Sequence, residues 1–206
     1  MAERVALIDY GAGNLHSVHN ALNAAGTGDI AVTDDPDVVR AADRIVLPGV
    51  GAFAACMGGL SAIPGMIDAL EDRVLGDRVP FLGICVGMQL LAERGLEHGV
   101  HYGLGWIGGE VRALEASAAI KVPHMGWNDV VPVAGAPLIV PGEAYFLHSY
   151  HFVAAEDGDV AAVTDHGRPV TAAVARGNIM GVQFHPEKSQ AYGLALLRRF
   201  LDWTMP

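Results

Sequence analysis

Residues 83–87 read Gly-Ile-Cys-Val-Gly and hold one cysteine between two glycines, after an apolar run and before a plausible helix. This G-x-nucleophile-x-G form is typical of a tight strand-to-helix turn, in which only glycine permits the close approach of neighbouring backbone. A helix that begins at such a turn directs its amino-terminal dipole at the sulfur and favours the thiolate form. The alternative for Cys85 is a buried structural thiol, and for a cysteine met alone that alternative would be favoured.

A thiolate nucleophile needs a base and a group that orients the base. His185 ends an apolar, strand-like run, and Glu187 follows two residues later. If the chain stays extended, the two side chains lie on the same side. Taken alone, His185 is better interpreted as a strand-end histidine without a catalytic role. Beside the Cys85 turn, a triad of Cys85, His185 and Glu187 becomes the better interpretation.

Acyl transfer also needs hydrogen-bond donors for an oxyanion. The segment PGVGAF at residues 48–53 follows a strand that we expect near the Cys85 strand, and its glycines let backbone N–H groups approach a ligand. We expect the donors to be the backbone N–H groups of Gly51 and Val86. An ordinary glycine-rich turn is the alternative, and spacing alone does not separate the two.

Two other patterns carry no chemistry in our interpretation. GLGWIG at residues 103–108 matches G-x-G-x-x-G, but a strand-like run follows it, so no helix amino terminus is offered to a pyrophosphate. H-x-x-H pairs occur at positions 16/19, 98/101 and 148/151. The last pair falls on a predicted strand, where positions three apart face opposite sides, and the first has no third ligand. We predict no metal and no cofactor.

The elements that must position these residues alternate in type over the first half of the chain. Apolar runs indicate four strands, at residues 4–9, 29–33, 43–49 and 79–85. Between the first two, residues 15–25 have apolar side chains at helical spacing, and Gly26 ends the pattern. Residues 86–94 are expected to form the helix that follows Cys85.

Strands that alternate with helices and are apolar on both faces predict an α/β fold with a parallel sheet covered by helices. Active sites in such sheets collect at the carboxyl ends of the strands, where the turn YGAGN (residues 10–14) and the two glycine-rich turns above fall. The second half reads instead as strands joined by short turns, several of them antiparallel. An amphipathic helix over residues 189–204 closes the chain.

Length and composition favour a single domain over residues 1–206, since no composition break or repeat divides the chain. The net charge of −10 argues against nucleic acid or an anionic membrane as a partner. No segment reaches the roughly 18–20 apolar residues that span a bilayer, and the first ten residues do not resemble a secretory signal. Two cysteines are too few for a disulfide scaffold. We expect a cytoplasmic protein.

The Cys85 turn, Gln89 one turn later, the upstream glycine turn and the distal H-P-E together resemble the class I (triad-type) glutamine amidotransferase family, over essentially the whole chain. The segments IDYGAGNLHSV, PGVGAF, PHMGWN, LHSYHF and GVQFHPEKS resemble, more narrowly, glutaminase subunits of histidine biosynthesis. One departure is Val86, where the family most often has leucine. Because the role expected of Val86 uses its backbone N–H, this difference leaves the expectation unchanged.

The resemblance implies a flavodoxin-like core and hydrolysis of glutamine to glutamate and ammonia by the triad. It implies that Gln89 and the backbone around Ser149 and Tyr150 hold the amino-acid end of the substrate. It also implies a heterodimer with a (β/α)₈-barrel cyclase that receives the ammonia. The family places six of the chain's residues near that interface: Asn14, Met125, Trp127, Asn128, Tyr145 and Lys188. Core packing is the open alternative for Met125 and Trp127.

The residues support a separate acceptor independently, because one hydrolytic domain uses almost the whole chain and leaves no room for a second catalytic domain. Three alternatives stay open. The first is a glutaminase for another synthase, such as those of anthranilate, GMP, carbamoyl phosphate or pyridoxal phosphate formation. The second is a stand-alone cysteine hydrolase or stress protein of flavodoxin-like fold. The third is an inactive regulatory subunit. The distal H-P-E argues against the second, and the intact triad against the third.

Overall fold

The structure, a computed structural model, describes residues 3–11, 13–26, 29–117 and 120–204; Ala12, within the expected turn at 10–14, lies outside them. The larger of two sheets in this part of the chain has nine strands, in the spatial order β2 (Ile30–Thr33), β1 (Val5–Ile8), β3 (Arg44–Gly49), β4 (Phe81–Cys85), β13 (Ile179–Val182), β12 (Pro169–Arg176), β11 (Val160–Asp165), β8 (His124–Pro132) and β9 (Gly142–His148). The smaller sheet has four strands, in the order β10 (Tyr150–Ala154), β7 (Gly109–Ala113), β5 (Arg94–Gly95) and β6 (His101–Tyr102).

The large sheet changes from parallel to antiparallel in the middle. Strands β2, β1, β3, β4 and β13 are parallel neighbours. From β13 onward, β12, β11, β8 and β9 pair antiparallel. The parallel part has the 2-1-3-4-5 order of flavodoxin-like sheets, whose ligands bind at the carboxyl ends of the strands. The predicted α/β fold, parallel first and antiparallel later, is confirmed.

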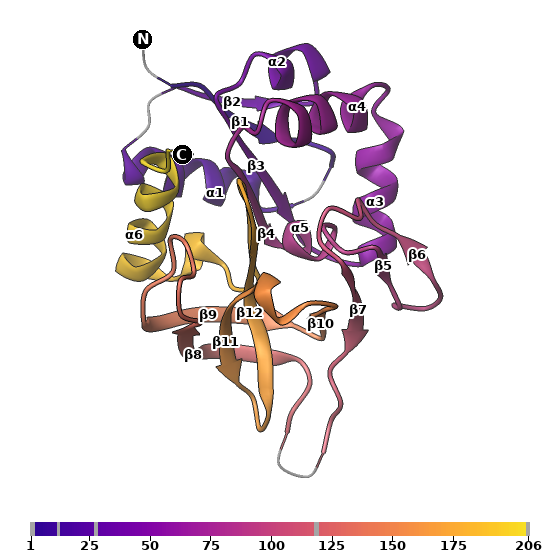
Figure 1. Ribbon diagram of the computed structural model, residues 1–206, viewed down its shortest axis with the longest axis vertical. Coiled ribbons are helices and arrows are strands. Elements are labelled where there is room, and N and C mark those ends of the chain that lie inside the picture. Colours follow the sequence, from indigo (N-terminus) through magenta and orange to yellow (C-terminus); the bar gives the residue numbers. More distant parts are fainter. Residues whose placement is uncertain (1–2, 12, 27–28, 118–119, 205–206) are drawn as a thin grey trace.

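Helices cover both faces of this sheet. Figure 1 shows α1 (Leu15–Ala25) and α6 (Gln190–Leu201) side by side on one face, and α3 (Phe53–Ala62), α4 (Met66–Glu71) and α5 (Val86–Gln89) on the other. The short α2 (Pro36–Arg40) packs against α4. As predicted, α1 buries one apolar face and stops before Gly26, its C-cap, whose φ of 123° suits glycine.

The helix after Cys85 is shorter than predicted, and the prediction of a helix over residues 86–94 is wrong. Helix α5 ends at Gln89, and Arg94 already belongs to β5. The backbone carbonyls of residues 90–93 accept hydrogen bonds from the N–H groups of residues 103–105 and 107 instead of continuing the helix. This pairing between segments distant in sequence replaces the local pattern, and it carries the chain into the small sheet.

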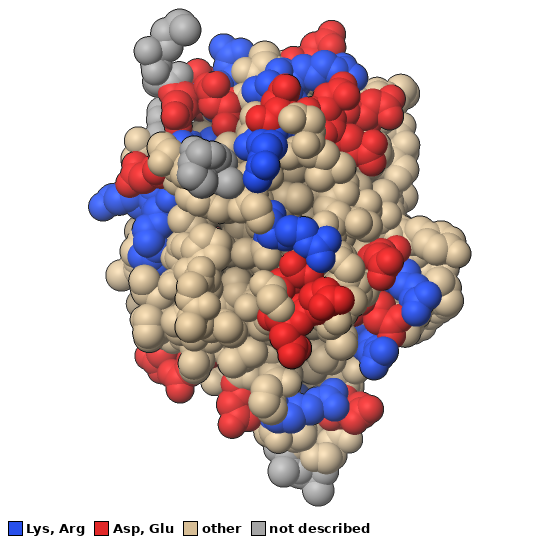
Figure 2. Space-filling view, viewed as in Figure 1, with Lys and Arg blue, Asp and Glu red and all other residues tan. Residues whose placement is uncertain are grey.

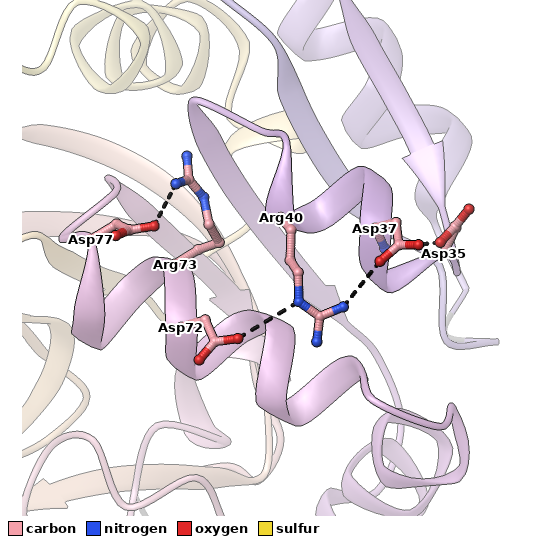
Figure 3. Close-up of polar contacts among 6 residues, drawn as sticks. All are labelled: Asp35, Asp37, Arg40, Asp72, Arg73 and Asp77. Carbon is pink, nitrogen blue, oxygen red and sulfur yellow. Dashed lines mark hydrogen bonds and ion pairs between the residues drawn. The ribbon is translucent and has the colours of Figure 1, made fainter.

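Helix α2 is joined to the π-helical turn η1 (Asp72–Gly76), which continues α4, by one ion pair at the surface, Arg40 with Asp72. Arg40 contacts Asp37 at 3.1 Å and Asp72 at 3.6 Å, and Arg73 contacts Asp77 at 2.6 Å (Figure 3). Exposed pairs of this kind contribute about 0–1 kcal/mol each, so they add little to the stability of the fold. Figure 2 shows acidic and basic side chains intermingled over α2 and α4, with wide uncharged areas elsewhere on that face.

Among the described residues, no single helix combines the length and hydropathy needed to cross a membrane. Helix α3 and the continuous segment of α4 and η1 are together long and apolar enough to do so, but the two are bent by 95° relative to each other.

Candidate active site

Cys85 lies at the point where β4 ends and α5 begins, with φ 54° and ψ −110°. Such angles are rare for a residue other than glycine and are found where the surrounding structure imposes them. Here the close approach of the backbone at Gly83, Gly87 and Leu47 imposes these angles on Cys85. A Cβ on Gly83 would lie 2.6 Å from the Gly87 carbonyl oxygen, and a Cβ on Gly87 would lie 1.9 Å from the Leu47 carbonyl oxygen. Only glycine fits on either side of Cys85, as the motif predicted.

His185 reaches the sulfur from the neighbouring strand. It follows β13, which pairs with β4, and its Nδ1 lies 2.8 Å from Glu187 Oε1. The connection differs from the extended chain that we predicted, because residues 186–188 form the 3₁₀ turn η3 (Pro186–Lys188). That turn brings Glu187 back to the imidazole. The two side chains are only 3% and 1% exposed, so the pair is closed to solvent.

The environment of His185 favours its protonated form. Burial by itself lowers the pKa of His185, but hydrogen bonds and charge from Cys85 and Glu187 outweigh burial and raise that pKa to about 9. At neutral pH an imidazolium therefore lies beside the sulfur. A cysteine paired with such a group can act as a nucleophile, and the imidazolium can give its proton to a leaving group.

One pocket is lined by Cys85, His185 and both residues expected to donate to an oxyanion, Gly51 and Val86. Gly51 has φ +100°, a conformation that side chains rarely adopt, although no atom lies within 4 Å of where its Cβ would be. Its glycine is therefore required by backbone geometry rather than by space. The oxyanion role of Gly51 and Val86 stays a prediction.

The residues expected to hold the substrate line the same pocket: Gln89, Ser149 and Tyr150. Gln89 Nε2 donates to the Tyr150 carbonyl oxygen at 3.0 Å and to Gln183 Oε1 at 3.0 Å. Within the described part of the chain, both amide hydrogens of Gln89 are thus used, and its Oε1 is the atom left for a ligand.

Sequence reasoning missed Gln183. This side chain is fully buried, and its Nε2 lies 3.7 Å from Cys85 Sγ. The signal was available in GVQFHPE, where an uncharged polar residue interrupts an apolar strand two positions before His185. Four residues that do line the pocket were also not predicted: Val50, Glu97, Leu147 and His148.

Of the residues expected at a partner interface, Met125 and Trp127 lie on the outer face of β8 and are 64% and 48% exposed. The alternative that they pack in the core is wrong. Tyr145 stands opposite Trp127 on β9, with ring centroids 6.2 Å apart. Asn128 alternates to the other face of β8 and donates from Nδ2 to the Asp165 carbonyl oxygen at 2.8 Å.

The last two expected interface residues lie beside the site. The Asn14 side chain donates to Glu187 Oε1, and Lys188 lines the pocket. An interface role for all six residues stays a prediction.

The comparisons with known proteins cover nearly the whole chain. The family model "Glutamine amidotransferase class-I" matches residues 6–203. The chain is 62% identical, over 97% of its length and 96% of the other, to "Imidazole glycerol phosphate synthase subunit HisH" of Zymomonas mobilis. It is 52% identical to the protein of that name from Rhodospirillum rubrum, over 98% of this chain and 99% of the other.

Solved structures share the fold at low sequence identity. "Crystal structure of glutamine amidotransferase" aligns with a TM-score of 0.75 at 20% identity, over 96% of this chain and 97% of the other. "Structure of PurLQS from Thermotoga maritima" aligns with a TM-score of 0.71 at 19% identity, over 98% of this chain and 99% of the other. These likenesses concern the fold alone.

Proposed function

The chain belongs to the class I glutamine amidotransferase family, and from this we propose that it is the glutaminase subunit of an imidazole glycerol phosphate synthase, in histidine biosynthesis. The observation that carries the proposal is the buried pair of His185 and Glu187 beside Cys85, in a chain whose relatives of equal length bear that name. Residues 1–206 act as one glutaminase domain, and the cytoplasm is its compartment.

The reaction follows from the three side chains. Cys85 Sγ attacks the carboxamide carbon of glutamine, and the C=O electrons move onto oxygen. As the tetrahedral intermediate collapses, the C–N bond breaks and His185 gives its proton to the departing ammonia. His185 then takes a proton from water, and the resulting hydroxide attacks the thioester carbon. The C–S bond breaks, which gives glutamate and the Cys85 thiolate. Glu187 keeps the ring oriented and balances its charge in each step.

The pocket supplies the remaining roles. The backbone N–H groups of Gly51 and Val86 donate hydrogen bonds to the oxyanion. The oxyanion forms from the substrate carbonyl next to the strained Cys85 turn. Gln89 Oε1 accepts from the ammonium group of glutamine, since both Nε2 hydrogens of Gln89 are used within the protein. The backbone at Ser149 and Tyr150 contacts the amino-acid end of the substrate.

Ammonia released into water is protonated and lost as a nucleophile, so the reaction needs an acceptor subunit over the pocket. The exposed face of β8 and β9 is suited to this. Leu147 both lines the pocket and is 37% exposed, and it pairs across the strands with Met125. An apolar surface therefore runs from the pocket mouth to Trp127. The partner that we propose is a (β/α)₈-barrel cyclase, bound as a heterodimer, which takes the ammonia through its barrel.

The nucleophile is tested by Cys85→Ser in the complex of this chain with its cyclase. Glutamine-dependent product formation should fall at least about a thousandfold, whereas formation from added ammonia should survive, because the acceptor site is untouched. Cys56→Ser is the matched control. Cys56 is the other buried thiol, and its Sγ donates to the Val50 carbonyl oxygen, a bond that serine retains. If Cys85→Ser abolished both activities, the assignment of Cys85 as nucleophile would be wrong.

The partner is tested by co-purification with a barrel cyclase and by the activity of the chain alone. The isolated chain should hydrolyse glutamine slowly, and the rate should rise by orders of magnitude with the cyclase and its nucleotide ligand, since the glycines around Val50 allow the oxyanion turn to change conformation. Trp127→Ala should weaken the complex about tenfold or more, as truncation of a central aromatic anchor does. High constitutive activity of the chain alone would contradict this proposal.

A further inference from the structure

His148 joins the two sheets of the molecule at the edge of the pocket. It is the last residue of β9 in the large sheet, and after Ser149 the chain enters β10 of the small sheet. The ring bridges this change of direction, because its Nδ1 lies 2.9 Å from the carbonyl oxygen of Tyr150. The same oxygen accepts from Gln89 Nε2. His148 thus holds a carbonyl that also positions a substrate-binding side chain.

The second ring nitrogen of His148 contacts another histidine. His124 faces it across strands β8 and β9, with His124 Nδ1 and His148 Nε2 2.9 Å apart. Both rings are buried, at 4% and 6% exposure. His124 Nε2 lies in turn 3.0 Å from Asn128 Nδ2. The contacts form a chain from the pocket to the partner-side strand β8.

The contacts dictate where the ring protons lie. A carbonyl oxygen only accepts, so His148 Nδ1 carries the hydrogen that faces Tyr150, and His148 Nε2 presents a lone pair. His124 must then donate from its Nδ1, which leaves its own Nε2 to accept from Asn128. Every contact is satisfied when both rings are neutral and protonated on Nδ1. A second proton on His148 would set two N–H groups against each other.

The surroundings keep His124 in place and uncharged. Its ring is stacked between Phe146 at 4.7 Å and His166 at 4.2 Å, with interplanar angles of 19° and 24°. Burial, followed by the nearby His166, lowers the pKa of His124 to about 4. For His148, burial is again the main cause and lowers the pKa to about 3. A neutral pair is therefore the form present at physiological pH.

We propose that His148 is a positioning residue for the substrate of this pocket, and that His124 fixes the tautomer in which His148 donates to Tyr150. His148 holds the Tyr150 carbonyl against Gln89, and His124 holds the ring of His148. The identity of the ligand, glutamine, rests on the proposed function above. The arrangement of protons does not, and the two can be tested separately.

The tautomers are tested by long-range ¹H–¹⁵N NMR spectra of the histidine rings in the full chain at pH 7.5. The variants His148→Asn and His124→Asn each remove the signals of the replaced ring and so identify those signals among the nine histidines of the chain. Both rings should be neutral with the hydrogen on Nδ1. A charged ring, or a His148 that carries its hydrogen on Nε2, would overturn the proposal whatever the enzyme does.

The positioning role is tested by a matched pair of variants in the complex with the cyclase. The amide nitrogen of His148→Asn replaces Nδ1 and keeps the donor to Tyr150. The amide of His148→Gln replaces Nε2, keeps the contact with His124 and loses the donor to Tyr150. The KM for the substrate glutamine should rise about tenfold in His148→Gln and stay within about threefold of the unmodified value in His148→Asn. The kcat should change less than about threefold in both variants.

His166→Phe is the control, because it preserves the stacking on His124 and removes no member of the chain of contacts. Its KM should match that of the unmodified protein. Equal KM values for the two His148 variants would overturn the positioning role. A wild-type complex that does not hydrolyse glutamine would instead overturn the proposed function and with it the substrate role, while the NMR measurement would still decide the tautomers.

Discussion

Asn14 donates from Nδ2 to Glu187 Oε1, the carboxylate oxygen that also contacts His185 Nδ1. Asn14 stands at the amino-terminal cap of α1, where its side chain would ordinarily accept from the helix backbone, but it makes no such bond. Its amide serves the candidate triad instead of the helix. Glu187 Oε2 is buried without a hydrogen-bond partner among the described residues, so Oε1 carries both contacts.

Asn14→Ala should lower kcat for glutamine hydrolysis about tenfold, because Glu187 loses one of two donors and orients His185 less firmly. Asn14→Asp should lower it further, since a second carboxylate would face Glu187. Steady-state kinetics of the complex measure both. Asn20→Ala, an exposed position on α1 whose amide contacts His16, is the matched control. Full activity in Asn14→Asp would refute a role in orienting Glu187.

The stability of the isolated chain should be greatest near pH 6.5. Above that pH the unfolded state loses the proton of His185 while the folded state, with a pKa of about 9, keeps it, so stability falls by on the order of 3 kcal/mol between pH 6.5 and 9. Below it the unfolded state takes up protons at His124, His148 and His151. Burial lowers their pKa values to about 4, 3 and 4, so stability falls again as pH falls towards 4.

Denaturant unfolding at a series of pH values measures this profile. His185→Gln should reduce the fall in unfolding free energy above pH 6.5 and leave the fall below pH 6.5 unchanged. His151→Gln should reduce part of the fall below pH 6.5 and leave the fall above it unchanged. Stability that increased from pH 6.5 to 9 would contradict the raised pKa of His185.

Gln183→Glu should slow alkylation of Cys85 by iodoacetamide about tenfold at pH 7, because a carboxylate 3.7 Å away would disfavour negative charge on Sγ. Gln183→Leu should have a smaller effect, since it removes a donor without adding charge. Mass spectrometry of the labelled protein, in a Cys56→Ser background, gives the rate. Faster labelling of Gln183→Glu would mean that the residue does not act on the sulfur.

Gly87→Ala should lower the free energy of unfolding by about 3 kcal/mol or more, or prevent folding, because its Cβ would overlap the Leu47 carbonyl. Gly58→Ala is the contrasting change. Gly58 lies within α3 with no atom within 4 Å of its Cβ position, so alanine there should stabilise the protein by about 0.5–1 kcal/mol. Denaturant midpoints of the two variants compare them, and similar destabilisation by both would be inconsistent with the overlap.

Local pattern was sufficient for the parallel half of the fold and for the Cys85 turn. Four apolar runs with helices between them imply adjacent parallel strands, and Gly83 and Gly87 around a cysteine imply a turn that only glycine permits. Where contacts join segments distant in sequence, the pattern was insufficient. Helix α5 stops at Gln89 because residues 103–105 and 107 take the next carbonyls, and no local feature predicts that.

The same limit applies to the site. His185 was recognisable from its neighbour Glu187 and from the motif around it. His148 and His124 were not, because their partnership depends on the antiparallel register of β8 and β9, which places them opposite each other. Asn14 was expected to face a partner, and its bond to Glu187 follows only from the packing of α1 against η3.

The three glycines packed between β3, β4 and α5 also have a genetic consequence. A Cβ on Gly49, Gly83 or Gly87 would come within 3 Å of backbone in each case. Any missense change in these codons adds that atom, so every single amino-acid substitution at these positions should be harmful. In a randomly mutagenised gene selected to complement a histidine auxotroph, these three codons should retain synonymous changes only, whereas the codon of Gly58 should drift.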